Sequence, residues 1–207
     1  MIDHARILAS LRDATGRDVS RETFDRLSHY VELLREESTR QNLVSAASLA
    51  DVWDRHIVDS AQLVRWAPSG DWIDLGSGAG LPGIVIACLV EKRVTLAEPR
   101  GLRADFLHRV VETLRLGATV IRSRAEVLSG QYAAITARAV APLTTLLEIS
   151  HHLSTGKSVW ILPKGRTAVA ELAEARKTWQ GVFHVERSVT DPDARIIVAR
   201  EVKARPS

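Results

Sequence analysis

Apolar residues recur at helical spacing through the first 70 residues of the chain. The clearest series is Phe24, Leu27, Val31 and Leu34. Residues three or four positions apart share one face of a helix, so this series predicts an amphipathic helix that begins after Ser20. A later helix is predicted to begin at Ser48, which fits a capping box with Asp51, and to end before Pro68. Residues 1–70 are therefore expected to form a helical cap.

From residue 72 the pattern changes to short apolar runs separated by helical stretches. The runs are 72–75, 93–98, 118–123, 132–137 and 158–162, and the helical stretches are 82–90, 102–116, 143–153 and 166–179. This alternation predicts a parallel sheet with helices on both faces. Two further runs, 182–188 and 194–201, are joined by the turn TDPD and leave no room for a helix. We expect an α/β core over residues 71–207 that ends in an antiparallel hairpin and forms one compact unit with the cap.

The composition is that of an ordinary soluble domain. Hydrophobic residues make up 45% of the 207 residues, and the longest apolar run, 84–90, is too short to span a bilayer. The N-terminus lacks the apolar stretch of a secretory signal, so we expect a cytoplasmic protein. One cysteine, Cys88, excludes an internal disulfide. The net charge of +3 and the excess of arginine over lysine favour a nucleic-acid partner only weakly, because a GC-rich genome also favours arginine.

The segment DLGSGAGLPG, residues 74–83, is rich in glycine and follows the first apolar run. A triphosphate-binding loop requires a lysine followed by serine or threonine, and this segment has neither pair. A dinucleotide fingerprint has a third glycine where this chain has Leu81, which weakens that interpretation without excluding it. The third pattern, G-x-G-x-G after a strand that ends in aspartate, is typical of loops that bind S-adenosylmethionine. Glu98, about 20 residues further on, is placed to bind a ribose in either of the last two cases.

Several short motifs elsewhere in the chain narrow the interpretation. They are Asn42-Leu43-Val44, Arg55-His56-Ile57-Val58-Asp59-Ser60, Leu81-Pro82-Gly83, Arg138-Ala139 and Pro163-Lys164-Gly165. Together they resemble the glucose-inhibited division protein B family, bacterial small-subunit ribosomal RNA methyltransferases that act on N7 of a guanine. The resemblance covers nearly the whole chain. It implies a class I S-adenosylmethionine-dependent methyltransferase with a Rossmann-like, mostly parallel sheet, a C-terminal antiparallel hairpin and a helical N-terminal cap.

The resemblance also implies roles for individual residues. The expected cofactor contacts are Asp74, Gly76, Ser77, Gly78, Leu81, Glu98, Ala125, Glu126 and Arg138. Arg138 would also position the incoming base and is the one residue given a catalytic role. The expected RNA contacts are Arg55, His56, Arg100, Arg103, Arg124 and Lys164. Leu102 stands where relatives often carry a basic residue, so we assign it no RNA contact.

Methyl transfer to guanine N7 needs no general base, because N7 presents a lone pair and no proton. The sequence is consistent with this reaction, because it lacks the segments that other classes of methyltransferase use. After the fourth strand it reads ARAVAPL, not the Asn/Asp-Pro-Pro-aromatic segment of adenine-N6 enzymes. Cys88 lies in an apolar helix, where it suits the core better than a pyrimidine-C5 thiolate nucleophile. These absences favour a substrate atom that is already nucleophilic, without singling out N7, and leave alignment as the main catalytic task.

Other residues have simpler explanations than RNA or metal binding. Arg55 and Asp59 stand four positions apart and suit an ion pair on a helix. The five tryptophans suit the core better than base stacking, and Arg109 and Arg115 are expected to be solvated. His151 and His152 point apart on a helix, so we expect no metal site.

We therefore expect S-adenosylmethionine as cofactor and small-subunit ribosomal RNA, or the 30S particle, as partner. We expect no membrane partner, no metal and a monomer. Two alternatives remain at this point. One is an NAD-dependent oxidoreductase, which Glu98 would also suit, and the other is a non-catalytic RNA-binding protein with a degenerate cofactor site.

Overall fold

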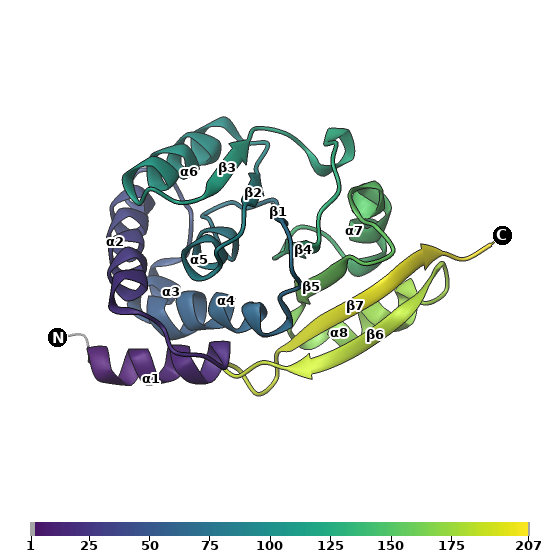
Figure 1. Cartoon of the computed structure of the whole chain (residues 1–207), viewed down its shortest axis with the longest axis horizontal. Helices are drawn as coiled ribbons and strands as arrows, with labels where there is room; N and C mark the ends of the chain where they lie inside the picture. Colours follow the sequence, from purple (N-terminus) through teal and green to yellow (C-terminus); the bar gives the residue numbers. More distant parts are fainter. Residues whose placement is uncertain (1–2, 207) are drawn as a thin grey trace.

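A computed structural model describes residues 3–206, and a seven-stranded sheet in the order β3-β2-β1-β4-β5-β7-β6 forms its centre (Figure 1). The strands are β1 (Trp72–Leu75), β2 (Val94–Ala97), β3 (Ala118–Ile121), β4 (Ala134–Ala137), β5 (Val159–Pro163), β6 (Trp179–Arg187) and β7 (Arg195–Ala204). Strands β1 to β5 pair in parallel, and β7 runs antiparallel to both β5 and β6. The predicted sheet and its terminal hairpin are thus confirmed.

Helices cover both faces of this sheet. Within residues 3–206 the α-helices are α1 (His4–Thr15), α2 (Arg21–Ser38), α3 (Ala46–Ala50), α4 (Asp59–Ala61), α5 (Gly83–Leu89), α6 (Gly101–Thr113), α7 (Leu143–Ser150) and α8 (Ala168–Ala175). The 3₁₀ turns are η2 (Gln62–Trp66), η3 (Ala125–Val127), η4 (His151–Leu153) and η5 (Gly165–Thr167), and η1 (Trp53–Val58) is π-helical.

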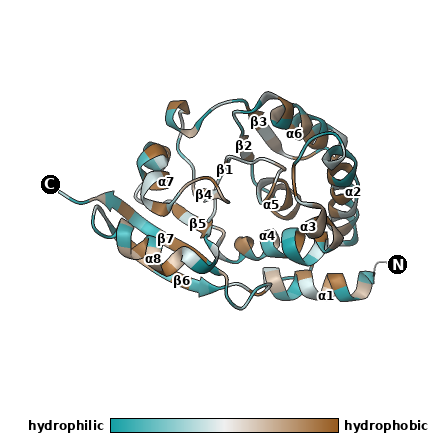
Figure 2. Ribbon diagram, turned by 180° about the vertical axis from the view of Figure 1, so that it is seen from behind, coloured by the Kyte–Doolittle hydropathy of each residue, from teal (hydrophilic) through white to brown (hydrophobic). Residues whose placement is uncertain are grey.

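The core consists of two hydrophobic layers, because successive side chains of a strand point to opposite faces. Trp72 of β1 packs with α5, α6 and the N-terminal helices, whereas its neighbour Ile73 packs with α7 and α8. The outer strand β6 is mostly exposed and hydrophilic (Figure 2). No helix within residues 3–206 has the length and hydropathy needed to cross a bilayer.

The N-terminal helices join the first of these layers, so they share a core with the sheet. Tyr30 of α2 is fully buried, and its hydroxyl donates a hydrogen bond to the Ala79 carbonyl in the glycine loop at 2.8 Å. The predicted start of the later helix at Ser48 is wrong. Ser45 has the extended backbone of a capping residue and accepts a hydrogen bond from Ser48 N, while Asp51 ends α3.

The parallel strands bring four chain segments to one edge of the sheet. Leu75, the last residue of β1, is in register with Ala97 of β2 and Ala137 of β4, and Ala97 is in register with Ile121 of β3. The segments that follow these strands therefore emerge together. In open α/β sheets ligands bind in the crevice at the carboxyl ends of the strands.

Candidate active site

The glycine loop begins where β1 ends. Gly76, Gly78 and Gly80 have φ angles of +64°, +57° and +93°, in the left-handed region that favours glycine. A Cβ at Gly76 would lie 2.6 Å from Cγ2 of Val140, whereas a Cβ at Gly78 would lie 3.6 Å from the Gly76 carbonyl oxygen and 3.7 Å from Nη1 of Arg103. The loop is thus closely covered at Gly76, and Gly78 is in ordinary van der Waals contact with its neighbours.

Gly83 serves a different purpose from the glycines before it. A Cβ there would lie 2.3 Å from Cδ2 of Leu96 and 2.5 Å from Oδ2 of Asp74. The Gly83 N–H donates a hydrogen bond to that same Asp74 oxygen at 3.1 Å. In a dinucleotide fingerprint the third glycine permits such close helix–strand packing. Here Gly83, two positions after Leu81, permits it.

Two buried carboxylates flank the loop. Asp74 is fully buried, and its Oδ1 has no hydrogen-bond partner among the described residues. Burial raises the pKa of Asp74 to about 7, against the lowering effects of the Gly83 N–H and the Arg138 guanidinium. Glu98 is 3% exposed, and its two oxygens accept hydrogen bonds from Gly78 N and Arg100 N, both at 2.8 Å. The acidic end of β2 therefore lies directly against the glycine loop.

The remaining residues expected to contact the cofactor lie at the same edge. Ser77 and Leu81 are buried within the loop, and the Ser77 hydroxyl donates to the Asp74 carbonyl at 3.0 Å. Ala125 and Glu126 form a 3₁₀ turn after β3, with Ala125 half-buried and Glu126 exposed. The structure thus brings these residues to the edge that carries the loop and Glu98.

The residues at this edge fit S-adenosylmethionine. That cofactor has a cationic sulfonium, an ammonium and a ribose diol, but no phosphate. Asp74 offers a buried carboxylate oxygen without a partner among the described residues, and Glu98 offers a second buried carboxylate against the glycine loop. Two buried carboxylates suit a cationic group and hydroxyl donors, whereas a pyrophosphate would be repelled by them.

Arg138 follows β4 and meets two residues from the N-terminal part of the chain. Its Nη1 lies 3.8 Å from Oδ2 of Asp59 and 3.4 Å from Nδ1 of His56. The Arg55–Asp59 ion pair expected from their spacing is not among the ion pairs of residues 3–206, because Asp59 faces Arg138. Arg55 is exposed.

His56 is neutral at physiological pH in this arrangement. Burial, together with the guanidinium groups of Arg138 and Arg55, lowers the pKa of His56 to about 4. Because Arg138 donates to Nδ1, the ring proton of the neutral imidazole is on Nε2. That atom is buried and has no hydrogen-bond partner among the described residues.

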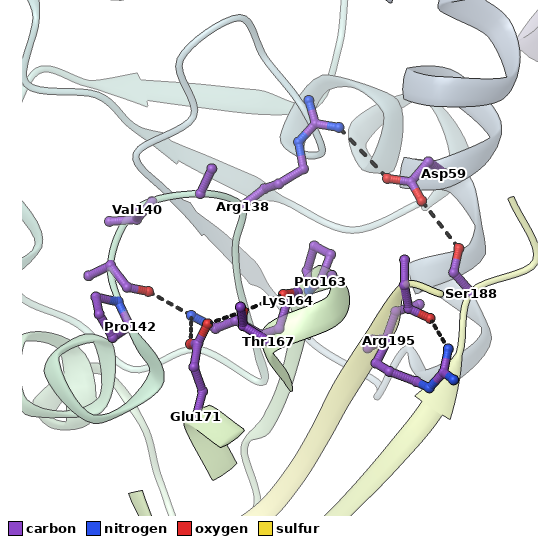
Figure 3. A pocket seen from close by; sticks show the side chains of 15 residues that line it. Asp59, Arg138, Val140, Pro142, Pro163, Lys164, Thr167, Glu171, Ser188 and Arg195 are labelled. Carbon is purple, nitrogen blue, oxygen red and sulfur yellow. Dashed lines mark hydrogen bonds and ion pairs between the residues drawn. The ribbon is translucent and has the colours of Figure 1, made fainter. Parts of the chain in front are cut away.

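A cleft of about 480 Å³ opens beside Arg138, between the loop after β4, the end of β5 and the hairpin (Figure 3). Lys164 lines it, but its side chain is only 8% exposed. Its Nζ donates to the Ala141 carbonyl at 2.6 Å and lies 3.1 Å from Oε2 of Glu171. Lys164 therefore links β5, the loop after β4 and α8, and its amine does not project freely toward a phosphate.

The other basic residues expected to meet RNA lie at the start of α6 and after β3. Arg100 and Arg124 are exposed, and Arg103 donates to the Asn42 carbonyl at 3.5 Å. Leu102, on the same turn of α6, is 72% exposed. The segments after β2 and β3 thus combine exposed cations with two exposed apolar side chains, Leu102 and Val127.

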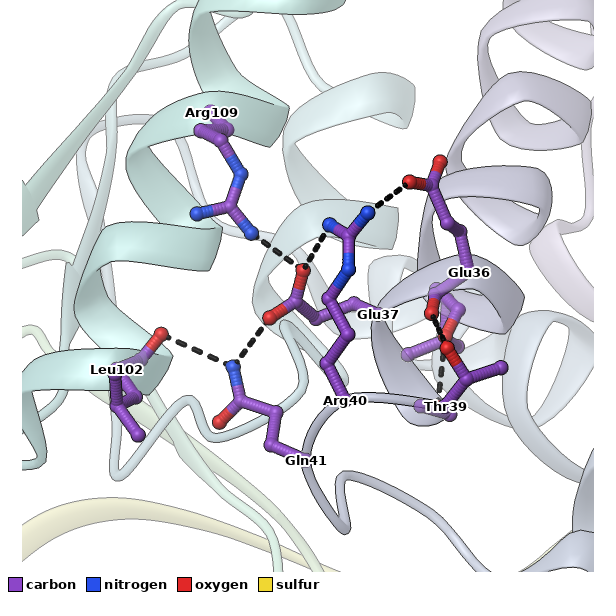
Figure 4. Close-up of polar contacts among 9 residues, drawn as sticks. Glu36, Glu37, Thr39, Arg40, Gln41, Leu102 and Arg109 are labelled. Carbon is purple, nitrogen blue, oxygen red and sulfur yellow. Dashed lines mark hydrogen bonds and ion pairs between the residues drawn. The ribbon is translucent and has the colours of Figure 1, made fainter.

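Arg109 differs from the expectation that it is merely solvated. It pairs with Glu37 of α2, whose carboxylate also accepts a hydrogen bond from Gln41 Nε2 at 2.8 Å (Figure 4). The same Gln41 nitrogen donates to the Leu102 carbonyl at 3.1 Å. Glu37 therefore fixes the end of α2 against α6.

Two expectations about core residues are confirmed. Trp53, Trp72, Trp160 and Trp179 are buried, and Trp66 is half-buried and packs against the core. Cys88 is buried, and burial raises the pKa of its thiol to about 12. His151 and His152 each contact a backbone carbonyl, those of Val202 and Leu128. Within residues 3–206 no group of three metal-binding side chains gathers.

The sequence interpretation missed three residues that shape the site. They are Tyr30, which holds the glycine loop, Asp59, which faces Arg138, and Glu171, which pairs with Lys164. Of the three, only Asp59 could be suspected from the sequence, because it belongs to the RHIVDS motif. The Tyr30 contact joins residues 49 positions apart, and the Lys164–Glu171 pair joins the end of β5 to α8, so both depend on tertiary packing.

The sheet order, the glycine loop after β1 and the acidic end of β2 define a class I S-adenosylmethionine-dependent methyltransferase fold. The B. subtilis M1A22 tRNA methyltransferase TrmK has this fold, with a TM-score of 0.56, 17% identity and coverage of 69% of this chain and 64% of that one. The glycopeptide N-methyltransferase MtfA, solved with S-adenosylmethionine, has a TM-score of 0.56 and 12% identity over 69% of this chain and 93% of that one.

The sequence comparisons identify the family. The family model for rRNA small subunit methyltransferase G, called GidB, matches residues 23–195. A protein of Novosphingobium aromaticivorans named ribosomal RNA small subunit methyltransferase G is 51% identical over 86% of this chain and 80% of its own. The chain therefore belongs to the rRNA small subunit methyltransferase G family, which confirms the resemblance. The comparisons favour neither alternative function.

Proposed function

We propose that the protein transfers the methyl group of S-adenosylmethionine to N7 of a guanine in small-subunit ribosomal RNA. The observation that carries the proposal is the family match over residues 23–195, which includes the glycine loop, Glu98 and Arg138. The choice of guanine N7 comes from the family that the motifs resemble.

The cofactor would be held at the carboxyl ends of β1 to β4. The backbone at Gly76 and Gly78 would approach it closely, and Glu98 would bind its ribose hydroxyls. Ala125 and Glu126 would flank its adenine. In the structure two backbone amides bind the Glu98 carboxylate, one of them from the glycine loop itself, so its orientation is set before a ligand arrives.

When bound, S-adenosylmethionine supplies an electrophilic methyl group. The protein's own contribution is to align the base, because N7 has no proton to lose. Arg138 lies on the ligand-bearing edge and lines the cleft, where its guanidinium can orient an incoming nucleotide. The neutral His56 beside it adds no second positive charge near a purine that becomes cationic.

RNA docking would involve the basic residues around this edge and His56. Arg55, Arg100 and Arg124 are exposed, whereas Arg103 and His56 are half-buried. Phosphate contacts of this kind fix the orientation of a nucleic acid without reading its sequence. We assign Lys164 the task of holding the loop after β4, because Glu171 and the Ala141 carbonyl occupy its amine.

The test is methyl transfer in vitro from labelled S-adenosylmethionine to 30S subunits from cells that lack the protein. The wild type is expected to methylate them. Arg138→Ala is expected to lose turnover more than cofactor affinity. Arg93→Ala is the matched control, since Arg93 is exposed, precedes β2 at the opposite edge and pairs only with Asp71 among the described residues. Tight binding of NAD alone, or RNA binding without transfer, would contradict the proposal.

A further inference from the structure

Asp59 is the centre of a polar network that joins two distant parts of the chain. Its Oδ1 accepts hydrogen bonds from Thr190 Oγ1 at 2.7 Å and from Gln62 Nε2 at 2.9 Å. Ser188 Oγ lies 3.5 Å from the same oxygen. Gln62 also accepts from Val189 N at 2.9 Å. The turn between β6 and β7 is therefore fastened to the helical segment that carries the RHIVDS motif.

This network uses Oδ1 of Asp59 and leaves Oδ2 to contact Arg138. Oδ2 of Asp59 lies 3.8 Å from Nη1 of Arg138, and both side chains are 22% exposed (Figure 3). Gln62 and Ser188 are buried behind the carboxylate, so its orientation is fixed from the side away from Arg138. An ion pair whose carboxylate is already held in place loses less side-chain entropy than one between two free side chains.

A second carboxylate lies within electrostatic range of the same guanidinium, although no ion pair joins the two among residues 3–206. Asp74 is fully buried beneath the glycine loop with an unpartnered oxygen, and Arg138 is close enough to influence its charge. The other neighbour of Arg138, His56, is neutral and offers only one acceptor. Asp59 is therefore the fixed negative charge on the cleft side of Arg138.

We propose that Asp59 is a positioning residue for Arg138, and that the β6–β7 turn fixes Asp59 through Ser188 and Thr190. In this arrangement the C-terminal hairpin is part of the frame of the active site. The inference rests on the proposed function, because its effect is measured as methyl transfer. Misplacing a positioning group by about 1 Å can cost on the order of 100-fold in rate.

The principal test is Asp59→Asn, which keeps the shape and an acceptor for Thr190 but removes the charge that faces Arg138. We expect kcat on 30S subunits to fall by about 10- to 100-fold. Affinity for S-adenosylmethionine and for RNA should stay within about twofold. Asp54→Asn is the matched control. Asp54 lies on the same helical segment and pairs with Arg6 at 3.0 Å. This control therefore removes one negative charge at a position that does not face Arg138.

A double-mutant cycle separates positioning from a general structural role. Asp59→Asn added to Arg138→Ala should lower kcat by no more than about twofold further, because Asp59 acts through the removed residue. Additive losses would overturn the inference, as would kcat for Asp59→Asn within twofold of the Asp54→Asn value. If Asp59→Asn does not fold, Thr190→Val should still lower kcat several-fold, and unchanged kcat there would overturn the inference. Absence of transfer by the wild type would instead overturn the proposed function, and this inference with it.

Discussion

Replacing Gly83 with alanine should destabilise the protein through a steric overlap between α5 and β1. The new Cβ would lie 2.3 Å from Leu96 Cδ2, 2.5 Å from Asp74 Oδ2 and 2.9 Å from Asp74 Cβ. Ordinary carbon contacts are about 3.5–4.0 Å. Leu96 is fully buried, and the Asp74 Cβ is fixed to the strand backbone, so neither can move aside without repacking the core.

Two opposing effects decide the magnitude. Alanine is favoured over glycine in a helix by about 1 kcal/mol, and Gly83 is the first residue of α5. Overpacking a core costs about 1–3 kcal/mol, and three contacts below 3 Å place this site at the upper end. The steric cost should therefore outweigh the helix preference of alanine, with a net loss of about 2 kcal/mol in the free energy of unfolding. For a chain of 207 residues this lowers Tm by about 4–8 °C.

Thermal unfolding followed by circular dichroism measures this change. Gly117→Ala is the matched control, because a Cβ at Gly117 would meet nothing within 4 Å and its φ is not left-handed. The control should change Tm by no more than about 2 °C. A Gly83→Ala protein whose Tm equals that of the control would refute the close-packing role of Gly83.

Three further predictions concern the loop and its neighbours. Gly78→Asp should abolish binding of S-adenosylmethionine in calorimetry, because it places a charged side chain on a loop position with a left-handed φ where the cofactor is proposed to lie, whereas Gly156→Asp in an open turn should bind normally. Asp74 has its folded-state pKa raised from 3.8 to about 7, so the folded state binds more protons than the unfolded state between these values and its stability falls as pH rises through them. Asp74→Asn removes this pH-dependent loss. In urea titrations, the free energy of unfolding of Asp74→Asn minus that of the wild type should therefore increase by about 4 kcal/mol from pH 4 to pH 8. A difference that stays constant with pH would contradict the raised pKa of Asp74. The His56 ring should titrate in NMR near pH 4, and Arg138→Ala should move the midpoint upward.

The sequence predicted the sheet well because its central strands, β1 and β4, are short, apolar and buried between helices. The parallel order brought Glu98, Ala125 and Arg138 to the edge of the glycine loop, as strand–helix alternation requires. Local detail was harder to predict. The sequence predicted Ser48 as the helix start, and the backbone conformation shows that Ser45 is the cap.

The site contacts that cross between distant segments could not be predicted from spacing. Asp59 stands four residues from Arg55, which suits a helical ion pair, yet the segment packs against the end of β4 and presents Asp59 to Arg138. Lys164 follows β5 at the ligand-bearing edge, but Glu171 of α8 reaches its amine. In both cases the packing of one element against another decided the role of a charged residue.

The central claim is methylation of guanine N7 in small-subunit ribosomal RNA by this protein. Mass-spectrometric mapping of that RNA, from cells with and without the protein, tests it most directly. The proposed function predicts that one 7-methylguanosine disappears with the protein, returns with the wild-type chain and does not return with Arg138→Ala. An unchanged set of 7-methylguanosines, or loss of a methyl group from another atom or another RNA, would contradict the claim.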